Sequence, residues 1–396
     1  DLFTLDMLPE DNKRQKLLYG PENYEEYARR VASGFYFQDM RNMLHLNNAN
    51  GTFSEIGQLA GISNTDWSWS ALSADFDNDG WKDMFITNGY YKDVTNKDFL
   101  KFRGDYYFDQ SVKKSKVDTT YIVNQTVSTP IHNYIFKNTG NLKFEDKSRC
   151  WDIDQPGFSN GAAYSDLDND GDLDLVTNNI DAKASIYENL ANKLLPDHHY
   201  LALDLKGKDK NTGAYNAKVN VYSKEGMQSY EKMPVRGFQS SVGQTLHIGL
   251  GKTIAVDSLE VIWNHKSITV IKNPEVDKIL TLDQNNAVEM PKQSKLVVSP
   301  YFRSSNLIDY VHKEYPINDF KRQPLLTTMP SIFGPVIKVA DLDGNGTDDI
   351  ILGASKNSAT RILLQNENSK FIDAIIQGDD IKSSDAAIAV ADFDGD

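Results

Sequence analysis

A short acidic segment that recurs along the chain constrains its fold more than any other feature. ADFDNDGWKD, residues 74–83, places four aspartates and one glycine within nine positions. DLDNDGDLD begins at Asp166, DLDGNGTDD at Asp341, and the shorter DFDGD at Asp392. Crowded carboxylates repel one another, and three full copies of the segment therefore predict that something compensates the charge.

The acidic segments keep step with a second recurring element. Each full copy precedes an apolar strand, and hairpins of strand, Asn/Gly turn and aromatic end at Phe53, Phe144 and Phe371. The next acidic segment begins 22 residues later in the first two cases and 21 in the third. This spacing predicts a repeat of about four short strands with one acidic loop, which is the size of a propeller blade.

The ends of the sequence read as parts of the same repeat. DLFTLD resembles the strand after an acidic loop, with Asp1 as the last aspartate of that loop, and DFDGD resembles a loop that stops early. We therefore expect the sequence to be a fragment of a longer protein.

The repeats predict an all-β fold in several parts. TNKDFLKFRGDYYFDQSV, with a capping-box-like Thr95 and Asp98, and NYEEYARRVASGF are expected to be helical insertions into the blades. The alternating strands between 198 and 285 lack an acidic loop and indicate a separate β-domain. A short helix is expected in SNLIDYVHKEY, and repeats resume at Ile337. The expected parts are propeller blades at 1–195, a β-domain at 196–288, a connecting segment at 289–330 and further repeats at 331–396.

Composition excludes several classes of protein. The 396 residues are 40% hydrophobic, which is enough for packed cores. A net charge of −14 argues against nucleic-acid binding and favours cation binding. No apolar run approaches the length of a membrane helix. Because Cys150 is the single cysteine, an internal disulfide framework and a cysteine-rich metal site are excluded.

The acidic loops have the residue pattern of a calcium site. Oxygen-bearing side chains at positions 1, 3, 5 and 9 converge when the backbone curls, the glycine at position 6 permits the turn, and position 7 adds its carbonyl. Hard oxygen ligands in this number suit Ca²⁺, whereas zinc prefers His or Cys. The candidate ligands are Asp75, Asp77, Asp79, Trp81 and Asp83; Asp166, Asp168, Asp170, Asp172 and Asp174; Asp341, Asp343, Asn345, Thr347 and Asp349; and Asp392, Asp394 and Asp396.

Two other interpretations of the acidic loops, an EF-hand and a solvated turn, do not fit the sequence. An EF-hand requires Glu at position 12, where this chain has Ile86, Thr177 and Leu352. A solvated Asp/Gly turn would not explain three copies in register with a hairpin. Because Asn345 removes one negative charge, we expect the third loop to bind calcium most weakly, which titration of single-loop mutants would test.

Few other residues suggest chemistry. Trp67 and Trp69 lie two apart and would share one face of a strand, where propeller core is favoured over sugar stacking. His198 and His199 favour a boundary turn over a catalytic pair, and His247 is expected to pack inside a strand. For Arg236 the sequence leaves two roles open: a site residue, or a structural residue that anchors a turn.

The chain resembles proteins with FG-GAP/VCBS repeats, the calcium-bound propeller repeats of integrin α-chains and many bacterial surface proteins. The D-x-D-x-D-G-x-x-D loops between strands carry this resemblance. Residues 198–285 resemble the ASPIC/UnbV domain of cartilage acidic protein and its bacterial relatives, through GAYNAKV (213–219), RGFQS (236–240), LHIGLG (246–251) and VDSLEVIW (256–263). The resemblance implies bound Ca²⁺, the start of a second propeller, and export to a bacterial cell surface, outer membrane or the extracellular space.

Two classes of function remain. The first is a calcium-stabilised scaffold for adhesion that binds a protein or glycan and is not an enzyme. The alternative is a polysaccharide-acting enzyme, either a propeller lyase with Tyr, His or Arg near a central pocket or a glycosidase whose carboxylates lie in the insertions. No nucleophile elbow, Walker loop or zinc helix is present in the sequence.

Overall fold

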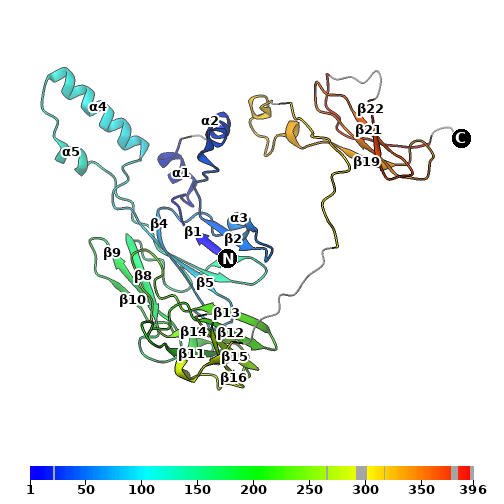
Figure 1. Ribbon diagram of the computed structural model, residues 1–396. Helices are drawn as coiled ribbons and strands as arrows, with labels where there is room; N and C mark the ends of the chain where they lie inside the picture. The colour runs from blue at the N-terminus through cyan, green and yellow to red at the C-terminus, as the bar shows by residue number, and fades with distance from the viewer. Residues whose placement is uncertain (21–22, 265, 291–300, 316, 376–381, 393–396) are drawn as a thin grey trace. The chain divides into compact units, whose positions relative to one another are not determined.

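The computed structural model describes residues 1–20, 23–264, 266–290, 301–315, 317–375 and 382–392 (Figure 1). The chain forms two compact units, Asp1–Lys292 and Gln293–Asp396. Most of the regular structure consists of short strands in several sheets, and no sheet in the described part of the chain closes on itself. The β-rich fold class expected from the sequence is confirmed.

Three small antiparallel sheets, which we name blades A, B and C, follow one another along the first unit. Blade B has the order β4-β5-β6-β7, whereas blades A and C have three strands each, β1-β2-β3 and β10-β9-β8. The strands of A are β1 (Leu2–Thr4), β2 (Met43–Asn47) and β3 (Phe53–Glu55); those of B are β4 (Ser68–Ala74), β5 (Asp83–Asn88), β6 (Tyr134–Asn138) and β7 (Phe144–Asp146); those of C are β8 (Ser159–Ser165), β9 (Asp174–Asn179) and β10 (Ser185–Tyr187).

Strand alternation lets blade B contribute to two cores. Met84 and Ile86 of β5 belong to one buried cluster with Leu44 of blade A. Phe85, between them, belongs to a second cluster with Leu175 of blade C. Successive side chains of a strand point to opposite faces, so a central blade is apolar on both sides. Fully burying one such side chain stabilises the fold by about 1.5–3 kcal/mol.

Helices lie mainly in the excursions between blade strands. Helix α4 is capped by Asn96, whose side chain accepts hydrogen bonds from the backbone of Asp98 and Phe99. The expected helix is therefore present, but Asn96 caps it and not Thr95. The helices are α1 (Asn12–Leu18), α2 (Tyr24–Arg30) with a π-helical turn over Val31–Phe35, α3 (Gly57–Ala60), α4 (Lys97–Lys113), α5 (Thr119–Asn124) and α6 (Ala191–Leu194).

The remainder of the first unit is a β-module built on two sheets. One sheet has the order β14-β11-β17, with β11 and β17 parallel, and the other has the order β13-β12-β15-β16-β18. Trp263 and Leu203 are among the side chains fully buried in its core. The strands are β11 (His199–Lys206), β12 (Lys218–Ser223), β13 (Gly226–Glu231), β14 (Leu246–Gly251), β15 (Ser258–Trp263), β16 (Ser267–Lys272), β17 (Ile279–Asp283) and β18 (Val288–Glu289), with a 3-10 turn at Gln284–Asn286.

The second unit contains one further four-stranded sheet, blade D. Its strands are β19 (Ile337–Ala340), β20 (Asp349–Leu352), β21 (Arg361–Gln365) and β22 (Phe371–Ile375), in sequential order. Two 3-10 turns, Asp319–Lys321 and Pro330–Ile332, precede it. The helix expected in residues 305–315 is wrong: no helical turn forms there, and Gly334 N–H instead donates to Glu314 Oε1 at 2.8 Å. Lys313 O also accepts a hydrogen bond from Ser355 Oγ, just after β20, so residues far along the chain bind the end of this short segment.

Candidate metal centres in the aspartate loops

Each of the three full acidic loops joins two antiparallel strands of one blade. The first loop (75–83) joins β4 to β5, the second (166–174) joins β8 to β9, and the third (341–349) joins β19 to β20. In every loop the carboxylates at positions 1, 3 and 9 offer oxygen atoms within 4.8 Å of one another. The structure thus brings together the side chains at positions 1, 3 and 9, whereas the expected position-5 ligands Asp79, Asp170 and Asn345 are not part of these triads.

The aspartate at position 9 connects each loop to its hairpin. Asp83 accepts hydrogen bonds from Phe76 N at 3.1 Å and from Asn138 N, on β6, at 2.8 Å. Asp174 does the same with Leu167 and Asn189, and Asp349 with Leu342 and Gln365, at 2.7–2.8 Å. The spacing between loops and hairpins therefore has a physical cause, since one carboxylate bridges both.

Asp1 occupies the same structural position in blade A. Its Oδ1 accepts a hydrogen bond from Asn47 N, at the end of β2, at 2.8 Å. Asn47 precedes Phe53 by the same six residues that separate Asn138 from Phe144. Asp1 is thus placed like the aspartate that ends each of the three complete loops.

The aspartate at position 1 shapes the turn. Asp75 accepts from Asp79 N and Gly80 N at 3.0 and 2.7 Å. Asp166 accepts from the same two loop positions, Asp170 N and Gly171 N, whereas Asp341 accepts from Gly344 N, one position earlier, and from Gly346 N. Gly80, Gly171 and Gly346 have φ angles of 94°, 95° and 79°, which favour glycine.

Three buried carboxylate oxygens have no hydrogen-bond partner among the described residues. They are Oδ1 of Asp77 in the first loop, and Oδ2 of Asp170 and Oδ1 of Asp172 in the second. Burying such an atom without a partner is unfavourable. A cation would satisfy it, so these orphaned oxygens fit a hard divalent ion such as Ca²⁺.

Burial also disfavours the charged state of Asp75 and Asp83 in the first loop. It raises the pKa of Asp75 well above its usual range, and the nearby charge of Asp83 adds to the effect. Burial raises the pKa of Asp83 to about 8, with the charge of Asp77 acting in the same direction. A divalent cation held by these oxygens would favour the ionised form and lower both values.

The sequence reasoning missed Asp172 as a carboxylate. It assigned this residue only a backbone carbonyl, yet its side chain is buried and its Oδ2 accepts from Asn192 N at 3.1 Å. At position 7 of each loop, the backbone N–H donates to the side chain at position 5. The carbonyl ligands expected from Trp81, Asp172 and Thr347 stay predictions.

The first loop already contains a positive charge. Lys137 Nζ pairs with Asp77 and lies 2.6 Å from Asp79 Oδ2. Lys137 directly precedes the hairpin residue that bonds Asp83, and the corresponding residues of the other two repeats are Glu188 and Leu364. A lysine at this position therefore balances part of the charge of the first loop, and the equivalent positions of the other two loops carry no positive charge. The sequence does show this difference. The lysine of YIFKN (134–138) is replaced by glutamate in SIYEN (185–189) and by leucine in RILLQ (361–365).

The first loop is also packed against the β-module. Asn78 Oδ1 lies 2.7 Å from His247 Nε2, and Asn78 O accepts from Gly251 N at 2.8 Å. A Cβ on Gly249 would lie 1.9 Å from Asp75 Oδ2, which explains a glycine at that position. His198 Nδ1 lies 2.7 Å from Asp77 O. The two histidines therefore contact the loop from the neighbouring module.

The third loop is more open. Asp341 and Asp343 are exposed, and only Asp349 of the carboxylate triad is buried. Asn345 Oδ1 accepts from Thr347 N at 2.7 Å, and its Nδ2 donates to Gln365 O at 2.9 Å. The expected weaker binding of this loop stays a prediction. In the fourth segment, Asp394 and Asp396 lie outside the described residues, and Asp392 is not part of a carboxylate cluster identified there.

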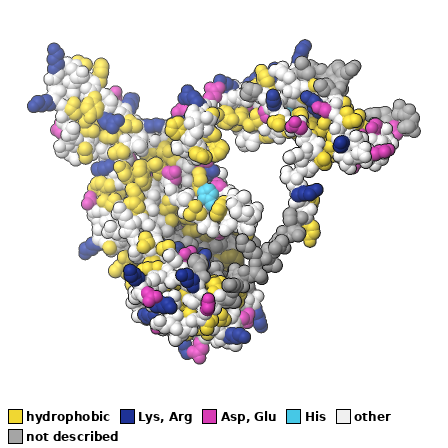
Figure 2. All heavy atoms as spheres, viewed as in Figure 1, with side chains coloured by type: hydrophobic (Ala, Val, Ile, Leu, Met, Phe, Trp, Pro, Cys, Tyr) yellow, Lys and Arg dark blue, Asp and Glu magenta, His cyan; other side chains and the backbone are white. Residues whose placement is uncertain are grey.

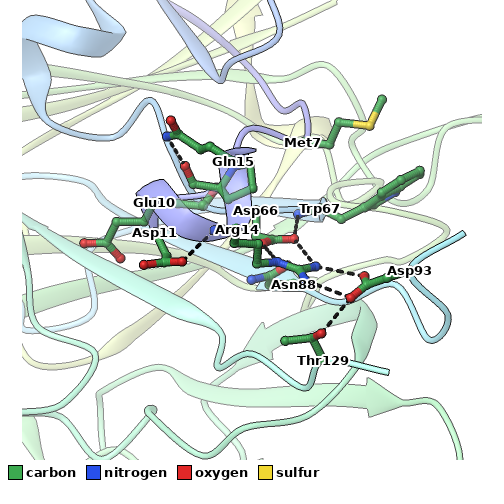
Figure 3. Close-up of polar contacts among 12 residues, drawn as sticks. Met7, Glu10, Asp11, Arg14, Gln15, Asp66, Trp67, Asn88, Asp93 and Thr129 are labelled. Atoms are coloured by element: carbon green, nitrogen blue, oxygen red, sulfur yellow. Dashed lines mark hydrogen bonds and ion pairs between the residues drawn. The ribbon is translucent and has the colours of Figure 1, made fainter. Parts of the chain in front are cut away.

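A second buried polar cluster connects the helical excursions to blade B (Figure 3). Arg14, on α1, binds both Asp66 and Asp93 through its guanidinium group, with Nη1 2.8 Å from Asp93 Oδ2. Thr129 Oγ1 donates to the same Asp93 oxygen at 2.6 Å. Burial alone would lower the pKa of Arg14, but its bonds to Asp93 and Asp66 outweigh burial and raise it. The arrangement anchors segments distant in the sequence.

The tryptophan pair is half-buried and belongs to an aromatic group. Trp67 stacks on Tyr90 at 4.2 Å, and Trp69 contacts Phe238 at 4.8 Å between ring centroids. Trp69 Nε1 also donates to Gly89 O at 2.7 Å. These contacts favour the packing role, with one face of the group bordering a shallow hollow that includes Asn160.

One small cavity bears on the enzyme alternative. Tyr164, Tyr230, Arg236 and His247 line a space of about 80 Å³ between blade B, blade C and the β-module. Arg236 Nη2 donates to Glu231 O at 3.3 Å, as a turn anchor would. The cavity is well below the 300–1,000 Å³ typical of ligand pockets. The cavity therefore brings together the Tyr, His and Arg side chains that a propeller lyase would use, but it has no room for a sugar chain.

Comparison with known proteins identifies two parts of the chain. Residues 207–289 match the ASPIC and UnbV family. Residues 31–86 match the FG-GAP-like repeat family, over strands of blades A and B and the first acidic loop. A comparison with curated proteins found no match. Among the described residues, no helix is long and apolar enough to cross a membrane. The chain thus carries an FG-GAP-like repeat followed by an ASPIC and UnbV domain.

Proposed function

We propose that the protein is an exported, calcium-stabilised β-propeller scaffold that binds a protein or glycan, and that it is not an enzyme. The observation that supports calcium most strongly is the repeated carboxylate triad, together with buried oxygens of Asp77, Asp170 and Asp172 that lack a partner in the described residues. An ion bound at these atoms would stabilise the folded state by mass action.

The scaffold role follows from where calcium would act. Each loop joins two strand ends, and its last aspartate also holds the next hairpin. An ion there would fix the blade geometry. Extracellular modules of this kind bind calcium at about 10⁻⁴–10⁻³ M, which suits a bacterial surface or extracellular location.

The visible surface is compatible with binding of a protein or glycan. Basic and acidic side chains are interspersed on it, and hydrophobic side chains lie among them (Figure 2). Helix α4 exposes Phe108 and Val112, at 70% and 66% of their full exposure. Such excursions from rigid repeats commonly carry contacts to partners.

Calcium titration followed by thermal unfolding tests the proposal. We expect Ca²⁺ to raise the melting temperature of the chain and a chelator to lower it, with Mg²⁺ less effective. Asp170→Asn should weaken this response, whereas Asp105→Asn, on the exposed face of α4, should not. An unchanged melting temperature with and without calcium would refute the structural role of the ion.

The enzyme alternative has a separate test. Polysaccharides incubated with the protein would be examined for new unsaturated or reducing ends, alongside a glycan array. Product formation that is lost in Tyr164→Phe or His247→Gln would favour a lyase in the small cavity. Glycan binding without product supports the scaffold.

A further inference from the structure

Blade C lacks the outer strand that blades B and D possess. In blade B, β7 pairs with β6, and in blade D, β22 pairs with β21. In blade C, β10 is the last strand, and its outer edge has no strand partner in the described part of the chain. The chain instead turns into the short helix α6. An unprotected edge is a template for another strand.

The counterpart of this edge in blade B shows which backbone groups are free. Ile186 of β10 corresponds to Ile135 of β6, since each lies three residues before the hairpin residue bound by the last loop aspartate. Ile135 donates its N–H to Ser148 Oγ at 3.0 Å and accepts from Lys147 N at 2.9 Å, both next to β7. Ile186 is 69% exposed. By this correspondence, its backbone N–H and C=O groups face the open edge of β10.

A groove of about 830 Å³ lies beside the open edge, between blades B and C. Its apolar lining includes Trp151, Ile153, Tyr187, Leu190 and Leu194. Leu194, Ile186 and Leu190 are 74%, 69% and 43% exposed, so they form a cluster of exposed apolar side chains beside the edge. A groove of this size and composition is typical of a binding site.

Blade B also shows what fills the corresponding place. Asp152, in the groove, corresponds to Gly61, because both follow their hairpin aromatic by eight residues. A Cβ on Gly61 would lie 3.5 Å from Phe144 O, at the start of β7. Strand β7 therefore covers the junction between blades A and B. Blade C has no equivalent of β7, so the junction between blades B and C is open.

The charges around the groove favour a basic occupant. Lys137 is shared between Asp77 and Asp79, and Glu188 pairs with Lys193. The three carboxylates in these pairs outnumber the two lysines by one negative charge, and Asp152 adds a second. A second copy of this chain, with a net charge of −14, is disfavoured by repulsion.

We propose that the β10 edge and this groove bind an extended segment of a partner polypeptide, which adds as a strand and resembles β7 in having an aromatic residue and basic flanks. Backbone hydrogen bonds to Ile186 would align the segment, and its aromatic side chain would pack on Trp151. The site is a specific place for the partner in the proposed scaffold function and rests on that function.

A labelled peptide with the sequence of residues 142–149, LKFEDKSR, tests this inference on the full chain by fluorescence anisotropy. We expect saturable binding below about 1 mM. Replacing Phe by Ala in the peptide, or N-methylating its backbone, should each weaken binding about tenfold or more. No saturation, or equal binding of the N-methylated peptide, would overturn the proposal.

Two variants of the protein locate the site. Ile186→Pro removes an outward N–H and is compatible with an edge strand, so the fold should survive while binding falls at least tenfold. Met227→Pro, on the edge strand β13 of the β-module, is the matched control and should bind normally. Trp151→Ala should weaken binding with an unchanged circular dichroism spectrum.

Other outcomes are distinguishable. If sedimentation showed dimers that Ile186→Pro abolished, the occupant would be a second copy and the inference of a separate partner would be wrong. Failure of peptide binding in a protein that still melts higher with calcium would overturn the docking site alone. Loss of the calcium response would overturn the proposed scaffold instead.

Discussion

Replacing Arg14 by methionine gives the clearest test of how the helical excursions are held to blade B. Arg14 is 12% exposed and forms ion pairs with Asp66 and Asp93, which are 4% and 3% exposed. Methionine keeps much of the side-chain length but removes all of the donors. Two buried carboxylates would then face each other without the guanidinium group.

The expected cost follows from this burial. Two unit charges 4 Å apart attract by about 4 kcal/mol at an effective dielectric constant of 20, and removing one partner of a buried pair costs about 3–5 kcal/mol. Thr129 already donates to one Asp93 oxygen in the unmutated protein, so this bond does not offset the loss. We therefore expect Arg14→Met to lower the free energy of unfolding of the first unit by about 3–5 kcal/mol.

Urea unfolding followed by circular dichroism measures this change. Arg30→Met is a matched control, because Arg30 pairs with Glu26 on the surface of α2, where both side chains are about half exposed. That pair is worth about 0.5 kcal/mol or less. If both variants lost the same small amount of stability, the cluster in Figure 3 would not anchor the excursions, and the reasoning from burial would be refuted.

Three further predictions concern the first loop. Lys137→Met should make the chain unstable without calcium and raise its calcium affinity, which titration calorimetry would measure; an unchanged affinity would contradict the competing role of the ammonium. Gly249→Ala should cost about 1–3 kcal/mol in urea unfolding because its Cβ meets Asp75, whereas Gly104→Ala, in open space on α4, should stabilise by up to about 1 kcal/mol. Burial lowers the pKa of His247 to about 4 from 6.5, so the unfolded chain binds more protons between these values. Stability should therefore fall by up to about 3 kcal/mol as the pH drops from 6.5 to 4, and His247→Gln should remove that part of the slope; an equal slope in the variant would contradict it.

The convergence of three carboxylates in each acidic loop could be predicted because it is local in the sequence, whereas the ligands expected at positions 5 and 7 stay predictions. Positions 1, 3 and 9 of one short turn must converge once glycine permits the bend, and the triads of all three loops do so. The repeat length and hairpins were equally readable, since alternation and Asn/Gly turns are properties of neighbouring residues. The helix expected in residues 305–315 failed for the opposite reason, because contacts to distant residues outweighed a weak local pattern.

The sequence by itself determined the repeating unit of this protein: its strands, its hairpins and the oxygen-rich turns that favour calcium. Only the tertiary structure decided how the copies differ. Lys137 enters the first loop, Gly249 and His247 close over it from the β-module, and blade C is left without an outer strand. The physical reason is distance along the chain. A turn is shaped by adjacent residues, whereas a buried charge, a close backbone approach and an open edge depend on residues up to about 170 positions apart.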